Sequence, residues 1–149
     1  EFYAVRGALE ESATRQAMPM KESDLQKLEN ELEAMHAAAI AQNLDGIAKH
    51  SVAFHEIIVK AAHNELLYTV WKSLCIETRT TVTLMAAGDS LVELADSHRE
   101  IIDTIKSGDV EAACSAARQH QDIFAFAVLI LILTLRPQGL LGERVADRA

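Results

Sequence analysis

The chain has 149 residues, half of them hydrophobic, and a formal net charge of −8. A chain of this size can bury the core of one domain. Its acidic balance provides no basic face of the kind that phosphate backbones require, so we do not expect this segment alone to bind nucleic acid. Cys75 and Cys114 form no CxxC pair, and we expect reduced, buried thiols in a cytoplasmic protein.

The first two helices are expected before residue 42. The first should end near Met18 and Pro19, and the second should begin at a capping box formed by Ser23 and Gln26. The inward stripe of the first helix should comprise Phe2, Val5, Leu9, Ser12 and Ala13. The inward stripe of the second should comprise Leu25, Leu28, Leu32, Met35 and Ala39.

The third and fourth helices follow a short turn. Asn43 is a suitable N-cap for the third helix, and the fourth should run from Glu65 to about Ala86, before Gly88. The inward stripe of the third helix should comprise Ile47, Ser51, Phe54, His55, Ile58 and Ala62. That of the fourth should comprise Leu67, Val70, Trp71, Leu74 and Thr78, with Thr81 or Val82.

Two more helices complete the pattern. Ser90 and Glu93 form a second capping box, Gly108 should end the fifth helix as a left-handed cap, and Asp109 should start the sixth. The inward stripe of the fifth should comprise Leu91, Leu94, His98, Ile101, Ile102 and Ile105. About six helices with short connections predict an all-α, antiparallel bundle.

Histidines on the inward stripes of three different helices are the main chemical feature of the sequence. His55, His98 and His120 lie in the third, fifth and sixth helices. Neutral imidazole is a good ligand for zinc, and three imidazoles with an oxygen donor would complete a metal site inside a bundle. The alternative is three unrelated core histidines, each hydrogen-bonded to a neighbour. The other histidines, His36, His50 and His63, are interpreted as structural or surface residues.

Four segments carry a resemblance to a known family. They are YAVRGALE near the start, AFHEIIVKAAHNELL in the third helix, SHREIIDTIKSGDVEAA across the fifth and sixth, and RQH at 118–120. Residues 1 to about 121 resemble the C-terminal effector-binding (FCD) domain of GntR-type transcription regulators of the FadR subfamily. The resemblance implies a helical bundle with a central cavity, in which a divalent metal helps to bind a small carboxylate effector. It also implies a homodimer, with DNA bound through an N-terminal winged helix-turn-helix that this chain lacks.

The resemblance also assigns site residues. The metal ligands that it implies are His55, His98 and His120, with zinc as the expected ion. The family has an aspartate as a further ligand, at the position of Ser51 in this chain. A serine hydroxyl brings no charge and a shorter reach, so Ser51 is a weak ligand or an outer-shell candidate. Water or an effector oxygen would then complete the coordination, or the cavity would work without metal.

Two arginines are candidates for binding the effector carboxylate. Arg6, in the first-helix VR pair, and Arg79, in the fourth helix, could each make a bidentate contact with a carboxylate. For Arg79 the alternative is a solvated or salt-bridged side chain.

The C-terminal tail departs from the family pattern. Residues 123–135, IFAFAVLILILTL, carry no charge, but a helix of roughly 20 Å is too short to cross a hydrocarbon core of about 30 Å. We expect a buried helix, with membrane association as a weaker alternative. The continuation LTLRPQGLLGERV resembles the C-terminal end of a branched-chain amino acid ABC transporter permease. We therefore expect an effector domain over residues 1–122 and an atypical tail over 123–149.

The leading interpretation is a sensor domain without catalytic residues. A helical metalloenzyme with a three-histidine zinc site is the rival, because such a site with one open position also hydrolyses substrates. A nonfunctional fused fragment is the third possibility.

Overall fold

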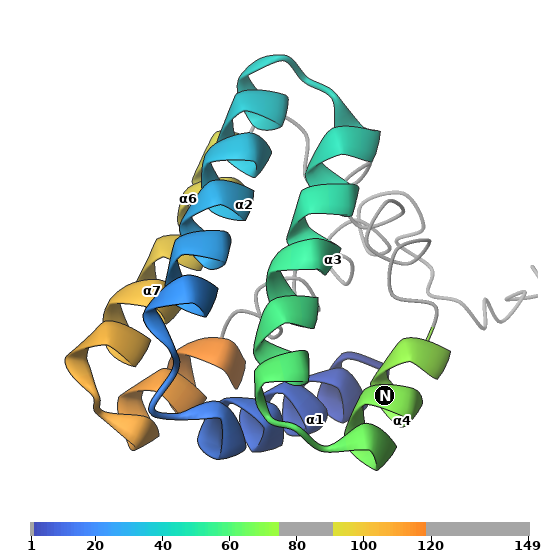
Figure 1. The fold of residues 1–149 in the computed structure, drawn as a ribbon. Helices are drawn as coiled ribbons and strands as arrows, with labels where there is room; N and C mark the ends of the chain where they lie inside the picture. The colour runs from blue at the N-terminus through green and yellow to red at the C-terminus, as the bar shows by residue number, and fades with distance from the viewer. Residues whose placement is uncertain (1, 75–90, 119–149) are drawn as a thin grey trace, which may run out of the picture.

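The computed structural model describes residues 2–74 and 91–118, and all regular structure in these ranges is α-helical (Figure 1). The helices are α1 (Phe2–Ala17), α2 (Glu22–Ile40), α3 (Leu44–Ala61), α4 (Glu65–Ser73), α6 (Leu91–Asp96) and α7 (His98–Ser107). A last helical stretch covers 110–118. The prediction of an all-α fold is confirmed. The predicted cavity also involves residues outside the described ranges and stays a prediction.

The α2–α3 hairpin is the centre of the fold. The two helices lie side by side and antiparallel because only residues 41–43 join them (Figure 1). Asn43 caps α3 as predicted, since its side-chain Oδ1 accepts a hydrogen bond of 3.0 Å from the Gly46 amide. All five residues of the predicted α2 stripe are buried. With Phe54 and Ile58 of α3 and the apolar residues of α6 and α7, they form the main core.

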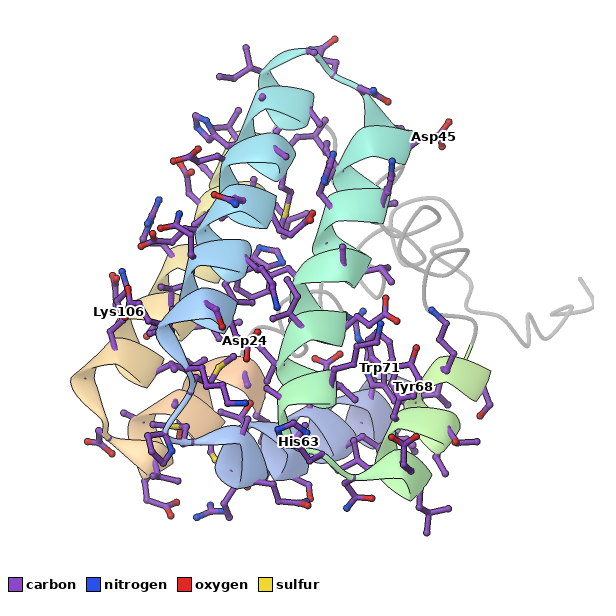
Figure 2. All side chains as sticks on the ribbon, in the orientation of Figure 1. Asp24, Asp45, His63, Tyr68, Trp71 and Lys106 are labelled. Carbon is purple, nitrogen blue, oxygen red and sulfur yellow. The ribbon has the colours of Figure 1, made fainter. Side chains whose placement is uncertain are left out.

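A second, smaller core lies on the other side of α3. In Figure 1, α1 crosses the end of the hairpin where α3 finishes, and α4 lies beside it. Ala13, Val59, Leu67 and Trp71 form this core, and Figure 2 shows Trp71 on the side of α4 that faces α3. Helix α3 therefore carries side chains into both cores.

The inward face of α1 differs from the predicted stripe. Val5 is 49% exposed and Ser12 is also exposed. The buried face is rotated by about one residue and comprises Arg6, Glu10, Ala13, Thr14 and Ala17. Hydrophobic periodicity failed here because an opposite-charge pair, one helical turn apart, points into the protein.

Two other local predictions were wrong. Helix α2 starts one residue before Ser23, with Lys21 at the N-cap and no side-chain capping bond, so the Ser23–Gln26 capping box does not form. Glu22 and Asp24 in the first turn instead complement the positive end of the helix dipole. Val70 is 40% exposed, although the stripe predicted it inside. The far end of the predicted fourth helix and the second capping box at Ser90 lie outside the described residues.

The predicted fifth helix is interrupted at Ser97. The Ser97 hydroxyl donates to the Leu94 carbonyl at 2.7 Å, and the His98 ring lies 3.2 Å from both the Leu94 and Ala95 carbonyl oxygens. Side chains that bond to carbonyls of the preceding turn compete with the helical ladder. Gly108 ends α7 with φ 75°, as predicted, and Asp109 caps the next helix through the Ala112 amide.

No helix among the described residues is both long and apolar enough to cross a membrane. The apolar run 123–135 lies outside the described residues.

We expect the α2 stripe to dominate stability. Leu28 is fully buried, so Leu28→Ala should lower the free energy of unfolding by about 2–5 kcal/mol. Leu66→Ala is the matched control, because Leu66 is 75% exposed and its truncation should change stability by less than about 0.5 kcal/mol. Urea denaturation followed by circular dichroism measures both. Equal losses would show that α2 does not pack as described.

Candidate metal and effector site

Two of the three predicted metal-binding histidines lie next to each other in the core. His55 of α3 and His98 of α7 are each 1% exposed, and their ring centroids are 5.4 Å apart. The Phe54 ring makes an edge contact with His98 at 5.1 Å between centroids. Two imidazoles from different helices therefore lie together in the solvent-excluded core.

The hydrogen bonds of His98 define its tautomer. Its Nδ1 faces two backbone carbonyl oxygens, which can only accept, so Nδ1 carries the proton. Its Nε2 lies 3.3 Å from the hydroxyl oxygen of Ser51, which then donates. Ser51, 2% exposed and one turn before His55, therefore contacts the nitrogen that would bind a metal.

The environment of His98 keeps its ring neutral. Burial, and then the neighbouring His55, lower the pKa of His98 to about 3, although the two backbone carbonyls act in the opposite direction. The ring is therefore uncharged at neutral pH, which is the state that binds metals.

His55 is held by a carboxylate that the sequence analysis did not identify. Glu10 of α1 is 2% exposed, and its Oε2 accepts a hydrogen bond of 3.1 Å from His55 Nδ1. Its Oε1 accepts from Arg6 Nε at 2.7 Å and from Trp71 Nε1 at 2.9 Å. One side chain of α1 thus joins α3 and α4 through two carboxylate oxygens.

The charge of Glu10 is stabilised in spite of its burial. Burial acts to raise the pKa of Glu10, but the combined attraction of Arg6 and His55 lowers the pKa well below its usual range. A buried carboxylate of this kind requires donors on both oxygens, because leaving it without them would cost several kcal/mol. The sequence contained two signals for it: an Arg and a Glu four residues apart, and a core tryptophan that needs an acceptor for its N–H.

The remaining predicted site residues divide into two groups. Arg6 is 2% exposed and lies near the histidine pair through its bond to Glu10. His120 and Arg79 lie outside the described residues. Within residues 2–74 and 91–118, no three His, Cys, Asp or Glu side chains are grouped so as to hold a metal ion.

The other histidines have surface or structural positions, as interpreted from the sequence. His63 is exposed, and the His36 side chain is 40% exposed and 3.5 Å from Asp96. His50 is partly buried and 2.8 Å from Glu31. Cys114 is a buried thiol, as predicted, and burial raises its pKa. Cys75 lies outside the described residues.

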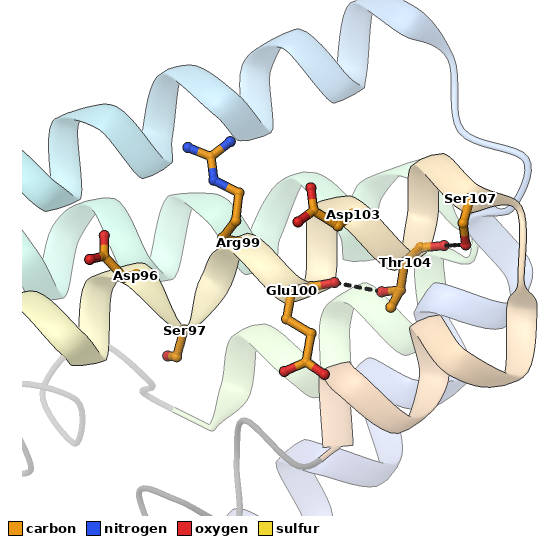
Figure 3. Close-up of a pocket in the computed structure, with 7 residues that line it drawn as sticks. All are labelled: Asp96, Ser97, Arg99, Glu100, Asp103, Thr104 and Ser107. Atoms are coloured by element: carbon orange, nitrogen blue, oxygen red, sulfur yellow. Dashed lines mark hydrogen bonds between the residues drawn. The ribbon is translucent and has the colours of Figure 1, made fainter.

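A hollow on the surface is a poor alternative site for an acid. It runs along α6 and α7 (Figure 3), and its charged lining consists of Asp96, Glu100, Asp103 and Arg99, all exposed. An anionic ligand there would meet three carboxylates and one guanidinium in water. The buried histidine pair is therefore the better candidate.

Comparison with known proteins identifies the family. The family model described as the FCD domain matches residues 1–122. The chain belongs to the FCD domain family. It is also similar to a probable D-xylose utilization operon transcriptional repressor of Paenarthrobacter nicotinovorans, with 32% identity over 120 residues. That match covers 80% of this chain and 53% of the repressor.

A solved structure supports the fold. E. coli McbR/YncC superimposes with a TM-score of 0.72 at 18% identity, covering 91% of this chain and 64% of that chain. This chain spans about half the length of the Paenarthrobacter repressor. That relative is a probable transcriptional repressor, in agreement with the prediction of a non-enzymatic domain. The family match ends at residue 122, and these comparisons lend no support to the resemblance of the tail to a permease.

The low pKa of His98 predicts a pH-dependent stability. In the unfolded chain His98 has its ordinary pKa of 6.5, whereas in the folded chain its pKa is about 3. The contribution of the neutral His98 ring to the free energy of unfolding is therefore fully present above pH 6.5. It is lost as the pH falls from 6.5 towards 3, by up to about 1.4 kcal/mol per pH unit. His98→Asn keeps an N–H near the two carbonyls but does not titrate.

Urea denaturation of metal-free protein between pH 6.5 and 4.5 tests this prediction. Glu10 contributes little to the change of stability in that pH range. Its lowered pKa adds stability that is lost only below pH 4.5, the ordinary pKa of a glutamate. We expect a clear positive slope of stability against pH in the wild type and a flatter slope in the variant. Identical slopes would show that His98 is not neutralised by its environment.

Proposed function

We propose that the chain is the effector-binding domain of a GntR-type transcriptional regulator and that it senses a small organic acid with a divalent metal, zinc being the expected ion. His55, His98 and His120 would hold the metal, with Ser51 at the edge of the coordination shell. The observation that carries the proposal is the meeting of His55 and His98 in the core. The family and the repressor relative support the regulatory role.

The hydrogen bonds that both histidines make through Nδ1 fit metal binding. A histidine that binds a metal usually donates its other ring N–H to a carboxylate or a backbone carbonyl. His55 donates to Glu10, and His98 faces the carbonyls of α6. Both rings therefore keep their protons on Nδ1 and would bind a metal ion through Nε2.

Charge balance supports an acid that arrives with a metal. Among the described residues of the site, the charges of Arg6 and Glu10 cancel, and His98 is neutral. A buried carboxylate needs a compensating cation. A divalent metal on neutral imidazoles would supply it, and Arg6, with Arg79 from outside the described residues, would add directed donors.

The rest of the regulator follows from this role. We propose a cytoplasmic homodimer that binds DNA through a separate N-terminal domain. The net charge of −8 supports this division, because phosphate backbones are bound by clustered Lys and Arg side chains. The effector would act by binding one conformation of the bundle more tightly than another.

Metal analysis followed by a thermal-shift screen tests the proposal. D-Xylonate and D-xylose are tested side by side, because the operon of the relative concerns D-xylose, and D-xylonate is the acid in which a carboxylate replaces the C1 aldehyde of the sugar. We expect bound metal in the wild type, a higher melting temperature with carboxylates such as D-xylonate, and loss of that effect in chelator. A ligand at a hundredfold excess over its Kd should add about 2.7 kcal/mol of stability.

Two results would contradict the proposal. One is wild-type protein that neither retains nor binds zinc, manganese or nickel. The other is stabilisation by D-xylose and not by any carboxylate, which would indicate an uncharged effector. His50→Ala is the control for His55→Ala and His98→Ala, because the partly buried His50 pairs with Glu31 and is not a proposed ligand, so metal affinity should stay unchanged.

Ser51→Asp should strengthen metal binding. A carboxylate in this buried position would oppose the charge of the ion, and we expect zinc to bind about tenfold tighter or more. Without metal the same variant should be less stable than the wild type, because it buries an extra charge. Ser51→Asn is the uncharged control of similar size. Zinc titration by calorimetry and melting with and without chelator measure both effects, and equal affinities of Asp and Asn would place Ser51 away from the metal.

A further inference from the structure

We infer that Glu10 is a positioning residue of this site, which fixes the tautomer of His55 from another helix. The inference rests on the proposed function for its purpose, but it stands on contacts that exist without any ligand. Glu10 Oε2 lies 3.1 Å from His55 Nδ1, in a location where both side chains are almost fully buried.

The two carboxylate oxygens of Glu10 accept hydrogen bonds from different donors. Oε1 accepts from Arg6 Nε at 2.7 Å and from Trp71 Nε1 at 2.9 Å, and these groups can only donate. Oε2 faces His55. If Glu10 served only to neutralise Arg6, one oxygen would be enough. The division of donors instead makes the second oxygen a fixed acceptor for the imidazole.

This acceptor determines which nitrogen of His55 carries the proton. A carboxylate oxygen accepts hydrogen bonds, so Nδ1 must be the N–H, and in the neutral ring Nε2 is then the nitrogen with the lone pair. His98 reaches the same tautomer in a different way, through the backbone of α6. The tautomer of His55 thus depends on α1, whereas that of His98 depends on the helix segment directly before it.

Glu10→Gln should reverse the tautomer of His55. Arg6 and Trp71 require an oxygen, so the side-chain amide of the variant would place its oxygen towards them and its NH2 towards His55. Nδ1 would then become the acceptor and the proton would move to Nε2. Ring-nitrogen NMR of 15N-labelled, metal-free protein at pH 8 reads this directly. We expect Nδ1–H in the wild type, Nε2–H in Glu10→Gln, and Nδ1–H at His98 in both.

The matched control is Glu11→Gln, the same change one residue along α1, at a carboxylate that faces Arg15 and Arg118 on the surface. This change should leave the tautomers of His55 and His98 as in the wild type. An unchanged His55 tautomer in a folded Glu10→Gln protein would overturn the inference. So would wild-type protein with a proton on His55 Nε2, a measurement that remains decisive if the variant does not fold.

Zinc titration separates this inference from the proposed function. If both hold, zinc affinity should fall about 10- to 100-fold in Glu10→Gln and stay unchanged in Glu11→Gln. A reversed tautomer in protein whose wild type binds no metal would support the positioning role and contradict the metal site. Wild-type zinc binding that Glu10→Gln leaves unaltered would contradict the positioning role and support the metal site.

Discussion

The buried carboxylate of Glu10 is the constraint on which the described site depends. A charge that leaves water must be matched by donors, and this one is matched by Arg6 from its own helix, Trp71 from α4 and His55 from α3. Trp71 and His55 require α4 and α3 to lie at a fixed distance from α1. The same bonds that make the burial tolerable therefore define how α1, α3 and α4 pack and how one imidazole is oriented.

The two histidines are attached to different parts of the fold. His98 is held by carbonyls at the interruption between α6 and α7, so its ring moves with that segment. His55 is held through Glu10, so its ring follows α1 as well as α3. A ligand that bridges the two rings would thus link the main core, formed by α2, α3, α6 and α7, to the smaller core under α1 and α4. Such a link is what a sensor domain needs in order to convert occupancy into a change of helix packing.

Most of the helices could be predicted from sequence, but the inward face of α1 could not. Apolar stripes identified α2 and α3, and Asn43 and Gly108 marked helix ends, because these signals are local. The α1 stripe failed because Arg6 and Glu10 are buried as a pair, and periodicity assigns charged residues to the surface. Trp71, which donates to Glu10, is sixty-one residues further along the chain, so this contact depends on tertiary packing that no local pattern contains. The histidines were identified because apolar stripes and the family resemblance indicated the same positions.

Serine at position 51 changes the electrostatics of the proposed site in two opposite ways. An aspartate would neutralise part of a bound dication and strengthen its attachment, leaving less positive charge for an effector. With serine and neutral imidazoles, the ion would be held less tightly but would keep its full charge, because the nearby Arg6 and Glu10 cancel each other. The Ser51 hydroxyl also donates to His98 Nε2, so a metal must displace that hydrogen bond. In such a site the metal and an anionic effector stabilise each other, and the pair should bind much more readily than either alone.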